Sequence, residues 1–506
     1  MTGDYDIAPP AAGAMIESLR AYGYTLETAI ADLIDNSIAA GAKNVWLNPE
    51  WNGDGSWISI LDDGIGMDEP TLVQAMRPGS QSPRQERAAD DLGRFGLGLK
   101  TASFSQCRSL TVAAKTVGAP IAIRRWDLDY VSRKDEWRLL KSCRRGSEEK
   151  LAVLNTKNQG TLVLLENLDR IAGNTTVDNK KDKSRFFENI DHLRAHLAMV
   201  FHRYLDGTSP RVRILIDGTD ESSMIIPWSP FGARHPATQP QPEEHLTMPD
   251  GHIPVQGFIL PHKDRMTEKD YAAMAGPTGW NEQQGFYVYR NRRLLVAGSW
   301  LGLGQAGRRW TREEHYKLAR IRIDLPNTMD EVFQIDVRKS KAILPSQIRG
   351  ALTEYAAQVR ETARGIFAHR GRYGNRGPAP DIARVWKTVS QGGSRKYLID
   401  RRHLALRSLL ETPRITRKNV ETALRIIEES VPVEQIWIDT SEHPENTGAP
   451  FSSVPENDVI ELADTVFKQY QDGGMTEHDA AEAVCRMDVF LDFQEIIRAY
   501  LNAGGE

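Results

Sequence analysis

Apolar residues recur every three or four positions along residues 12–22 and 26–42, a spacing that predicts two amphipathic helices. Residues 44–47 and 57–61 instead alternate apolar and polar positions on either side of the turn-rich sequence WNGDGS, which predicts two strands. Residues 69–77 return to a helical spacing. The chain is therefore expected to begin with helices that are followed by strands.

A polar segment rich in glycine and arginine, residues 78–98, is expected to be a mobile loop. Strand patterns resume after it at residues 109–114, 120–125 and 160–166. In this part of the chain, helices come first and are followed by a sheet, which a long loop interrupts. This order predicts an α+β sandwich.

The next part opens with a helical pattern over residues 186–205. Four further strand patterns lie at residues 211–216, 252–261, 285–296 and 318–324. The proline-rich residues 227–245, between the first two, are expected to be an excursion without regular structure. These patterns predict a second α+β domain.

The remainder of the chain is expected to be mainly helical. Residues 345–368 predict one helix, and residues 381–430 predict helices with a hairpin around Gly392 and Gly393. The acidic end, from about residue 455, also has a helical spacing. The predicted domains are residues 1–185, 186–345, 346–435 and 436–506.

Composition limits the class of protein. Of the 506 residues, 40% are hydrophobic and 26% are charged, which is ordinary for globular domains. No apolar run approaches the roughly 18 residues of a membrane span, and the first residues do not resemble a secretory signal. The three cysteines, Cys107, Cys143 and Cys485, lie far apart without metal-ligand spacing. A sparse, odd set fits a reducing environment, so we expect a cytoplasmic protein.

Charge is distributed unevenly along the chain. Residues 439–506 hold 15 Asp and Glu against three basic residues, a net charge of −12, which leaves +8 for the rest of a chain whose total is −4. Nine Lys and Arg fall within residues 338–376 and eight within residues 395–418, each with two acidic residues. Such clusters suit the phosphates of duplex DNA, without reading its sequence. They could also line an internal interface with the acidic tail, or simply be solvated.

The sequence ADLIDNS, residues 31–37, places Asp32 and Asn36 four positions apart on one predicted helix, so they share a face. Asn36 can ligate Mg²⁺ through its amide oxygen, and Asp32 can act as a general base on a water near that metal. An exposed Asp/Asn pair can also be merely solvated, so the motif alone does not decide.

The sequence LDDGIGM, residues 61–67, follows a predicted strand. Asp62 at the strand end can accept a hydrogen bond from the amino group of adenine. Gly64 and Gly66 let the backbone pass close under a flat base, to which Met67 offers an apolar surface. A plain Asp–Gly turn would explain the same residues.

The sequence GRFGLGLKT, residues 93–101, is a glycine-rich loop that runs into a helix, and its backbone N–H groups suit phosphate. Lys100 would add a charge contact. A P-loop is the competing interpretation, but Leu99 stands between Gly98 and Lys100 and rotates the lysine by about 100° around the helix. The segment also follows a polar loop, whereas a P-loop follows a buried strand.

Together and in this order, the three motifs resemble those of the GHKL ATPases: gyrase B subunits, heat-shock chaperones, histidine kinases and MutL. DLIDNSIAAGA and LDDGIGMD are similar to MutL segments, and GRFGLGLK is similar to the loop that closes over phosphate in MORC proteins. The step from Gly160 to Thr161 resembles one whose threonine helps hold adenine. The resemblance covers about residues 12–170 and implies a Bergerat-type α/β sandwich that binds ATP and Mg²⁺. The implied nucleotide contacts are Asn36, Asp62, Gly64, Gly66, Met67, Gly93, Arg94, Phe95, Gly96, Leu97, Gly98, Lys100 and Thr161, with Asn36 also the metal ligand.

One position departs from the resemblance, because MutL has glutamate where this chain has Asp32. The shorter side chain shifts the water that it can reach by about 1.5 Å. A misplacement of that size can slow a reaction about a hundredfold. We therefore expect slow ATP hydrolysis, with Asp32 as the catalytic base.

The second domain extends the resemblance. GFYVYRNRRL, residues 285–294, is similar to a MORC segment, and QIDVRKSK, residues 334–341, is similar to a MutL segment. In these families a lysine of this second, transducer domain reaches the γ-phosphate. Alignment places it at Lys341, with Lys339 as the close alternative. Exposed lysines at a basic strand end are the other explanation.

The resemblance implies an ATP-driven clamp in which the loop closes on phosphate and two N-terminal domains form a homodimer around a client. Duplex DNA is the preferred client, together with partner proteins of a bacterial restriction or phage-defence system. An ATP-dependent chaperone or signalling module without DNA binding is the alternative. A histidine kinase is disfavoured, because no histidine lies among the 11 residues before the first predicted helix. The sequence has no nuclease or zinc pattern.

Overall fold

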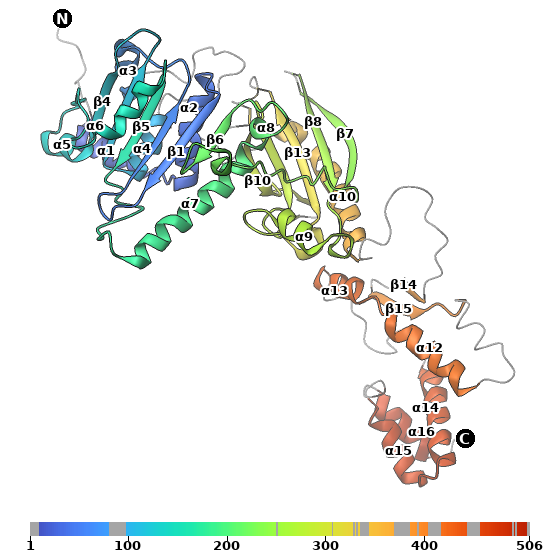
Figure 1. Ribbon diagram of the computed structural model, residues 1–506. Coiled ribbons are helices and arrows are strands. Elements are labelled where there is room, and N and C mark those ends of the chain that lie inside the picture. Colours follow the sequence, from blue (N-terminus) through green and yellow to red (C-terminus); the bar gives the residue numbers. More distant parts are fainter. Residues whose placement is uncertain are drawn as a thin grey trace, which may run out of the picture. The chain divides into compact units, whose positions relative to one another are not determined.

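The structure is a computed structural model (Figure 1). It describes residues 10–79, 98–248, 251–305, 307–326, 329, 332–333, 344–368, 385–391, 394–402, 416–442, 456–487, 490 and 493–502. The chain divides into two compact units, Met1–Arg372 and Tyr373–Glu506. The first unit contains two large mixed sheets and the second is mainly helical, so the predicted α+β class is confirmed. The bounds of the four predicted domains stay predictions.

The first sheet has six strands in the order β4-β3-β5-β2-β1-β6. Their bounds are β1 Asn44–Glu50, β2 Trp57–Asp62, β3 Ser109–Lys115, β4 Ala122–Asp127, β5 Gly160–Glu166 and β6 Arg213–Ile216. All neighbouring pairs are antiparallel except β1 with β6. The central pair β2–β5 aligns Asp62 with Thr161, which brings two of the predicted site residues side by side.

Helices cover one face of this sheet and form the main core with it. They are α1 Ala12–Arg20, α2 Leu26–Ala39, α3 Glu69–Met76, α4 Gly98–Gln106, α5 Leu128–Lys134 and α7 Lys180–Val200. The strand residues Val45, Leu47, Ile58 and Ile60 meet these helices, as alternation along a strand requires. Each such side chain contributes about 1.5–3 kcal/mol of burial free energy.

Two short helices on the opposite face were not predicted. They are α6 Glu148–Ala152 and the 3₁₀ turn η1 Val153–Thr156, whose Leu151 and Leu154 pack on Leu61, Leu162 and other residues of the sheet. Four or five residues are too few to display a helical period.

The second sheet has five strands in the order β10-β9-β13-β8-β7. Their bounds are β7 Gln239–Met248, β8 Gly251–Ile259, β9 Gly285–Arg290, β10 Arg293–Ser299 and β13 Ala319–Leu325. The helix α10, Ser346–Ala368, packs against β7, β8 and β13, and α9, Glu268–Ala275, lies outside the sheet (Figure 1). From the first sheet, α7 reaches this region and contacts both α2 and β10.

Two expectations for this sheet were wrong. Residues 285–296 are not one strand but a hairpin, because Asn291 and Arg292 both adopt left-handed backbone angles that reverse the chain. The proline-rich residues 227–245 are not wholly irregular, because β7 begins at Gln239. Prolines are tolerated there because β7 is the edge strand of the sheet.

Among the described residues of the second unit, β14 Trp386–Gln391 pairs with β15 Ser394–Ile399, as the predicted hairpin requires. Helices α12 Arg417–Glu429 and α13 Val433–Glu442 follow it. The acidic end forms α14 Glu456–Asp472, α15 Glu477–Cys485 and α16 Gln494–Asn502, which share a small apolar core. Among the helices that the structure describes, none is long and apolar enough to cross a membrane.

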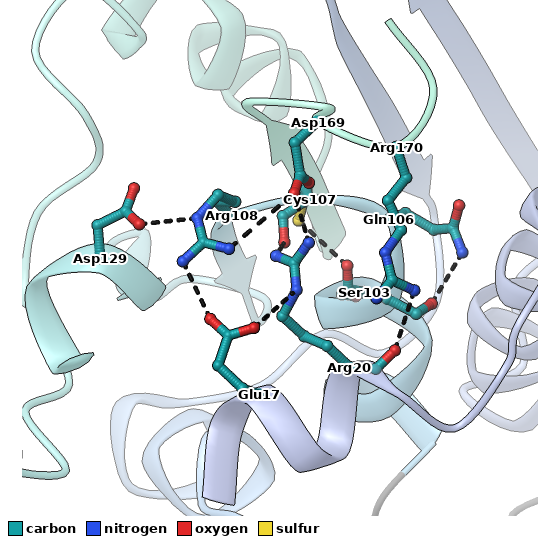
Figure 2. Close-up of polar contacts among 10 residues, drawn as sticks. Glu17, Arg20, Ser103, Gln106, Cys107, Arg108, Asp129, Asp169 and Arg170 are labelled. Atoms are coloured by element: carbon teal, nitrogen blue, oxygen red, sulfur yellow. Dashed lines mark hydrogen bonds and ion pairs between the residues drawn. The ribbon is translucent and has the colours of Figure 1, made fainter. Parts of the chain in front are cut away.

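A buried arginine fastens α1 to the first sheet (Figure 2). The Arg20 guanidinium donates hydrogen bonds to the Cys107 carbonyl oxygen at 3.1 Å and to an Asp169 carboxylate oxygen at 2.5 Å. Nearby, the Arg108 guanidinium donates to Asp129 at 2.7 Å. Burial raises the pKa of the Cys107 thiol to about 12, so this cysteine acts as an uncharged core residue.

We expect Arg20→Ala to lower the free energy of unfolding of the first unit by about 2–3 kcal/mol, because it leaves a buried carbonyl and a carboxylate without their donor. Arg20 is 3% exposed. The Arg108 side chain is 24% exposed, so the matched variant Arg108→Ala should cost less than about 1 kcal/mol. Chemical denaturation of both variants measures the difference, and equal losses would contradict this account.

Candidate functional site

The centre of the site is a buried carboxylate at the end of β2. Asp62 is 5% exposed and accepts three hydrogen bonds. The Ser37 hydroxyl donates to its Oδ2 at 2.8 Å, and the backbone N–H groups of Gly64 and Thr161 donate to its Oδ1 at 3.0 and 3.2 Å. Helix α2, strand β2 and strand β5 therefore meet at this side chain.

Two opposing effects act on the Asp62 carboxyl. Burial raises its pKa above the ordinary value, while the hydrogen bonds from Ser37, Gly64 and Thr161 act in the opposite direction. The neighbouring Asp63 differs: burial alone would raise its pKa, but hydrogen bonds from Asn44 and Lys43 hold it below the ordinary value. Asp63 thus has a structural role in holding β1, and Asp62 faces the helix layer.

Close packing explains the glycines that follow Asp62. Gly66 has a left-handed φ of 67°, and a β-carbon there would lie 2.0 Å from the Lys115 carbonyl oxygen. A β-carbon on Gly64 would lie 2.9 Å from the carbonyl oxygen and side chain of Ala40. Met67 is partly buried against the main core. Any contact of Gly64, Gly66 and Met67 with a base stays a prediction.

Helix α2 presents the other predicted pair. Thr25 is the N-cap residue of this helix and forms a capping box with Thr28. Asp32 is buried, and the Tyr24 hydroxyl donates to its Oδ2 at 2.8 Å. Asn36, one turn further on, is exposed. The pair therefore differs in environment: one carboxylate is sheltered and held by a hydrogen bond, and one amide is open to solvent.

Helix α4 brings part of the glycine-rich loop to α2. Its first residue, Gly98, lies beside Asp32, because a β-carbon on Gly98 would be 3.8 Å from Asp32 Oδ2. Lys100 is buried, and its ammonium donates to the Ala75 carbonyl oxygen at 2.9 Å. Burial lowers the pKa of Lys100 to about 8. In this structure Lys100 thus holds the end of α3, and its predicted phosphate contact stays a prediction.

Several predicted residues cannot be placed. Gly93, Arg94, Phe95, Gly96 and Leu97 lie outside the described residues, as do Lys339 and Lys341. The described residues contain no group of three or more His, Cys, Asp or Glu side chains that could hold a metal ion.

Sequence reasoning missed three residues of the site. Ser37 and Tyr24 hold Asp62 and Asp32, and no motif marked either as a partner. The third, Arg293 of β10, forms an ion pair with Asp35 of α2, with Nε and Oδ1 3.2 Å apart. Asp35 is 1% exposed, so this pair is buried and links the helix of the site to the second sheet.

Comparison with known proteins relates the region around this site to a family of ATPases. Residues 24–161 match the family model of histidine kinase-, DNA gyrase B- and HSP90-like ATPases. This region runs from Tyr24 to Thr161 and so contains both ends of the hydrogen-bonded site. The chain is also 24% identical over 227 residues to the ATPase morc-1 of Caenorhabditis elegans. That match covers 38% of this chain and 26% of the relative, so the chain spans about a quarter of that protein's length.

The order of motifs, the hydrogen-bonded Asp62 and the family match agree with one another. Residues 24–161 therefore match an ATPase domain of the GHKL type, and part of the chain is similar to a MORC ATPase.

Proposed function

We propose that this chain binds ATP with Mg²⁺ beside Asp62 and hydrolyses it slowly to drive a conformational clamp that acts on DNA. One observation carries the proposal: Asp62 is held by α2 and β5 next to a helix face that bears Asp32 and Asn36. An adenine acceptor, a general base and a metal ligand are thereby available on adjoining elements.

Adenine recognition follows from the lone pairs of Asp62. An ionised carboxylate has about four acceptor positions. The described residues fill three of them, two on Oδ1 and one on Oδ2. The remaining position on Oδ2 suits the amino group of adenine, and Thr161 lies beside it on β5.

The side chains beside Asp62 include a donor that suits Mg²⁺. Asn36 offers one exposed amide oxygen, and Mg²⁺ commonly takes one or two protein ligands while substrate phosphates and water supply the rest. When bound, the ion would neutralise charge on the transferring phosphoryl group.

Asp32 is proposed as the general base. The Tyr24 hydroxyl fixes one of its carboxylate oxygens, so Tyr24 is a positioning residue. The side chain is a methylene shorter than the glutamate of MutL, which is the reason to expect slow turnover. Phosphate contacts from Gly93 to Gly98, and from Lys341 or Lys339, complete the proposed site.

The clamp requires that the site communicate with the second sheet. The buried pair of Asp35 and Arg293 supports this, because Asp35 directly precedes Asn36 on α2 while Arg293 lies at the start of β10. Movement of α2 would therefore be transmitted to β10. The basic clusters at residues 338–376 and 395–418 support DNA as the client, and an ATP-dependent homodimer and defence-system partners are part of the same proposal.

The first test changes Asp62 to Asn. Oδ1 must still accept two backbone N–H groups, so the amide NH₂ takes the place of Oδ2 and faces the adenine amino group, donor to donor. We expect ATP affinity to fall about 10- to 100-fold. Guanine has a carbonyl oxygen at that position, so the preference for ATP over GTP should narrow. Calorimetric titration of both nucleotides measures this.

Folding provides the control for Asp62→Asn. Because burial raises its pKa, the Asp62 carboxyl stabilises the fold fully below its unfolded pKa, and this contribution is lost as pH rises through the folded pKa. At neutral pH the neutral amide should therefore not lower the melting temperature. ATP affinity should also weaken as the pH is lowered towards the folded pKa of Asp62, because a protonated carboxyl is a poorer acceptor for the adenine amino group. Unchanged ATP affinity in a folded Asp62→Asn variant would exclude the adenine contact.

The second test changes Asp32 to Asn. Turnover should fall at least a hundredfold with nucleotide affinity retained, because general-base catalysis is worth about 10²–10⁴. Tyr24→Phe should lower kcat about tenfold and leave KM unchanged. Asp54→Asn, at an exposed acid in the β1–β2 turn, is the matched control. Turnover that persists in Asp32→Asn would remove Asp32 from the mechanism.

The third test addresses the clamp by size-exclusion chromatography with light scattering. A non-hydrolysable ATP analogue should double the mass, and plasmid DNA should co-elute with an affinity that falls steeply with salt. Dimers that form without binding DNA would favour the chaperone alternative. A monomeric nucleotide complex would exclude the clamp. Nucleotide-dependent protection of Lys341 or Lys339 from acylation would identify the γ-phosphate contact.

A further inference from the structure

The first sheet carries a cavity on the face opposite to Asp62. Leu61 and Asp62 are neighbours on β2 and so point to opposite faces. Leu61 lines a cavity of about 440 Å³, a size typical of small-ligand sites, whereas Asp62 meets α2. The cavity is also lined by Trp46, Trp57, Lys150, Lys157 and Thr219.

Each tryptophan of this cavity has a lysine against its ring. The Lys157 ammonium lies 3.5 Å from the ring centroid of Trp46, and the Lys150 ammonium lies 5.1 Å from that of Trp57. Between the two tryptophans the floor is polar, because Asn48 of β1 and Ser59 of β2 are register partners.

The two lysines differ in charge balance. Lys150 is paired with the buried Glu166 carboxylate, with 2.8 Å between Nζ and Oε1. Lys157 has no carboxylate within salt-bridge distance among the residues that the structure describes. The end of the cavity at Trp46 therefore combines an aromatic face with a positive charge that is not neutralised, and this favours an anionic ligand.

We infer that this cavity binds a nucleobase linked to phosphate, with the base stacked on Trp46 and the phosphate on Lys157. The ligand would be either a free nucleotide or a unit of single-stranded nucleic acid. Thr219, Asn48 and Ser59 offer hydrogen-bonding groups to base edges without a fixed code. This site is separate from the ATPase site and does not depend on it.

Stacking of a base on Trp46 is strong enough to replace the contact that Lys157 makes with the same ring. A base must displace the Lys157 ammonium from the Trp46 ring, which gives up a cation–π contact worth about two- to fivefold in affinity. Stacking of the base contributes about fivefold to a hundredfold. The displaced ammonium is then available to a phosphate oxygen.

The spacing of the tryptophans favours a strand over a single nucleotide. Trp46 pairs with Leu61, which is four residues from Trp57 on β2. Four residues of a strand extend about 13 Å. One base cannot cover both rings at that separation, whereas successive bases of a single strand can.

The test uses the full chain without an added ATP analogue, because a saturating nucleotide would itself compete for the proposed cavity. Fluorescence anisotropy measures the binding of a labelled oligothymidylate, with thymidine monophosphate as the free-nucleotide arm. We expect Trp46→Ala and Lys157→Glu each to weaken oligothymidylate binding about tenfold. Trp137→Ala and Lys134→Glu, at exposed positions away from the cavity, should change it less than twofold.

A second measurement avoids the risk that Trp46→Ala disturbs the sheet. An oligonucleotide containing 5-iodouracil, irradiated with the unaltered protein, should cross-link to the peptide that contains Trp46 or Trp57. Binding of the monophosphate that competes with the oligonucleotide would identify the free nucleotide as the source. Cross-links only elsewhere, or equal binding by Lys157→Glu and Lys134→Glu, would overturn the inference.

Discussion

The structure of the site depends on the hydrogen bonds that one buried carboxylate accepts. Asp62 is almost fully buried, and an ionised group in that position is unfavourable unless donors surround it. The donors come from a helix, a turn and a neighbouring strand, so the same three hydrogen bonds that oppose the effect of burial on Asp62 also hold α2 against the β2–β5 pair. Ser37, which directly follows Asn36, ties the helix that bears Asp32 and Asn36 to Asp62.

Local patterns in the sequence were sufficient for most of the fold near the site. The apolar spacing of α2 and the alternation of β2 each extend over several residues, and Asp62 stands where a strand meets glycines, so these features were predicted. The antiparallel pairing of β14 with β15 was predicted from two adjacent glycines in the sequence between them. In each case, the pattern that predicts the element lies within one short segment of the sequence.

The features that were not predicted depend on residues far apart in the chain. Ser37 and Asp62, or Asp35 and Arg293, become partners only when the sheets assemble, and no spacing rule relates them. The donation from Lys100 to Ala75 likewise depends on the packing of α4 and α3. The start of β7 within a proline-rich segment depends on its place at a sheet edge, which the sequence around Gln239 does not reveal.

Register on β2 links the two faces of the first sheet. Between Trp57 and Asp62, alternate residues face the helices or the cavity, and six consecutive pairs with β5 fix this arrangement. A slip of one residue would place Asp62 among the leucines near α6 and move Leu61 into the proposed nucleotide site. The first change would bury a carboxylate among apolar side chains, and the second would place an apolar side chain among polar groups. The pairing that creates an acidic site on one face therefore also creates an aromatic cavity on the other.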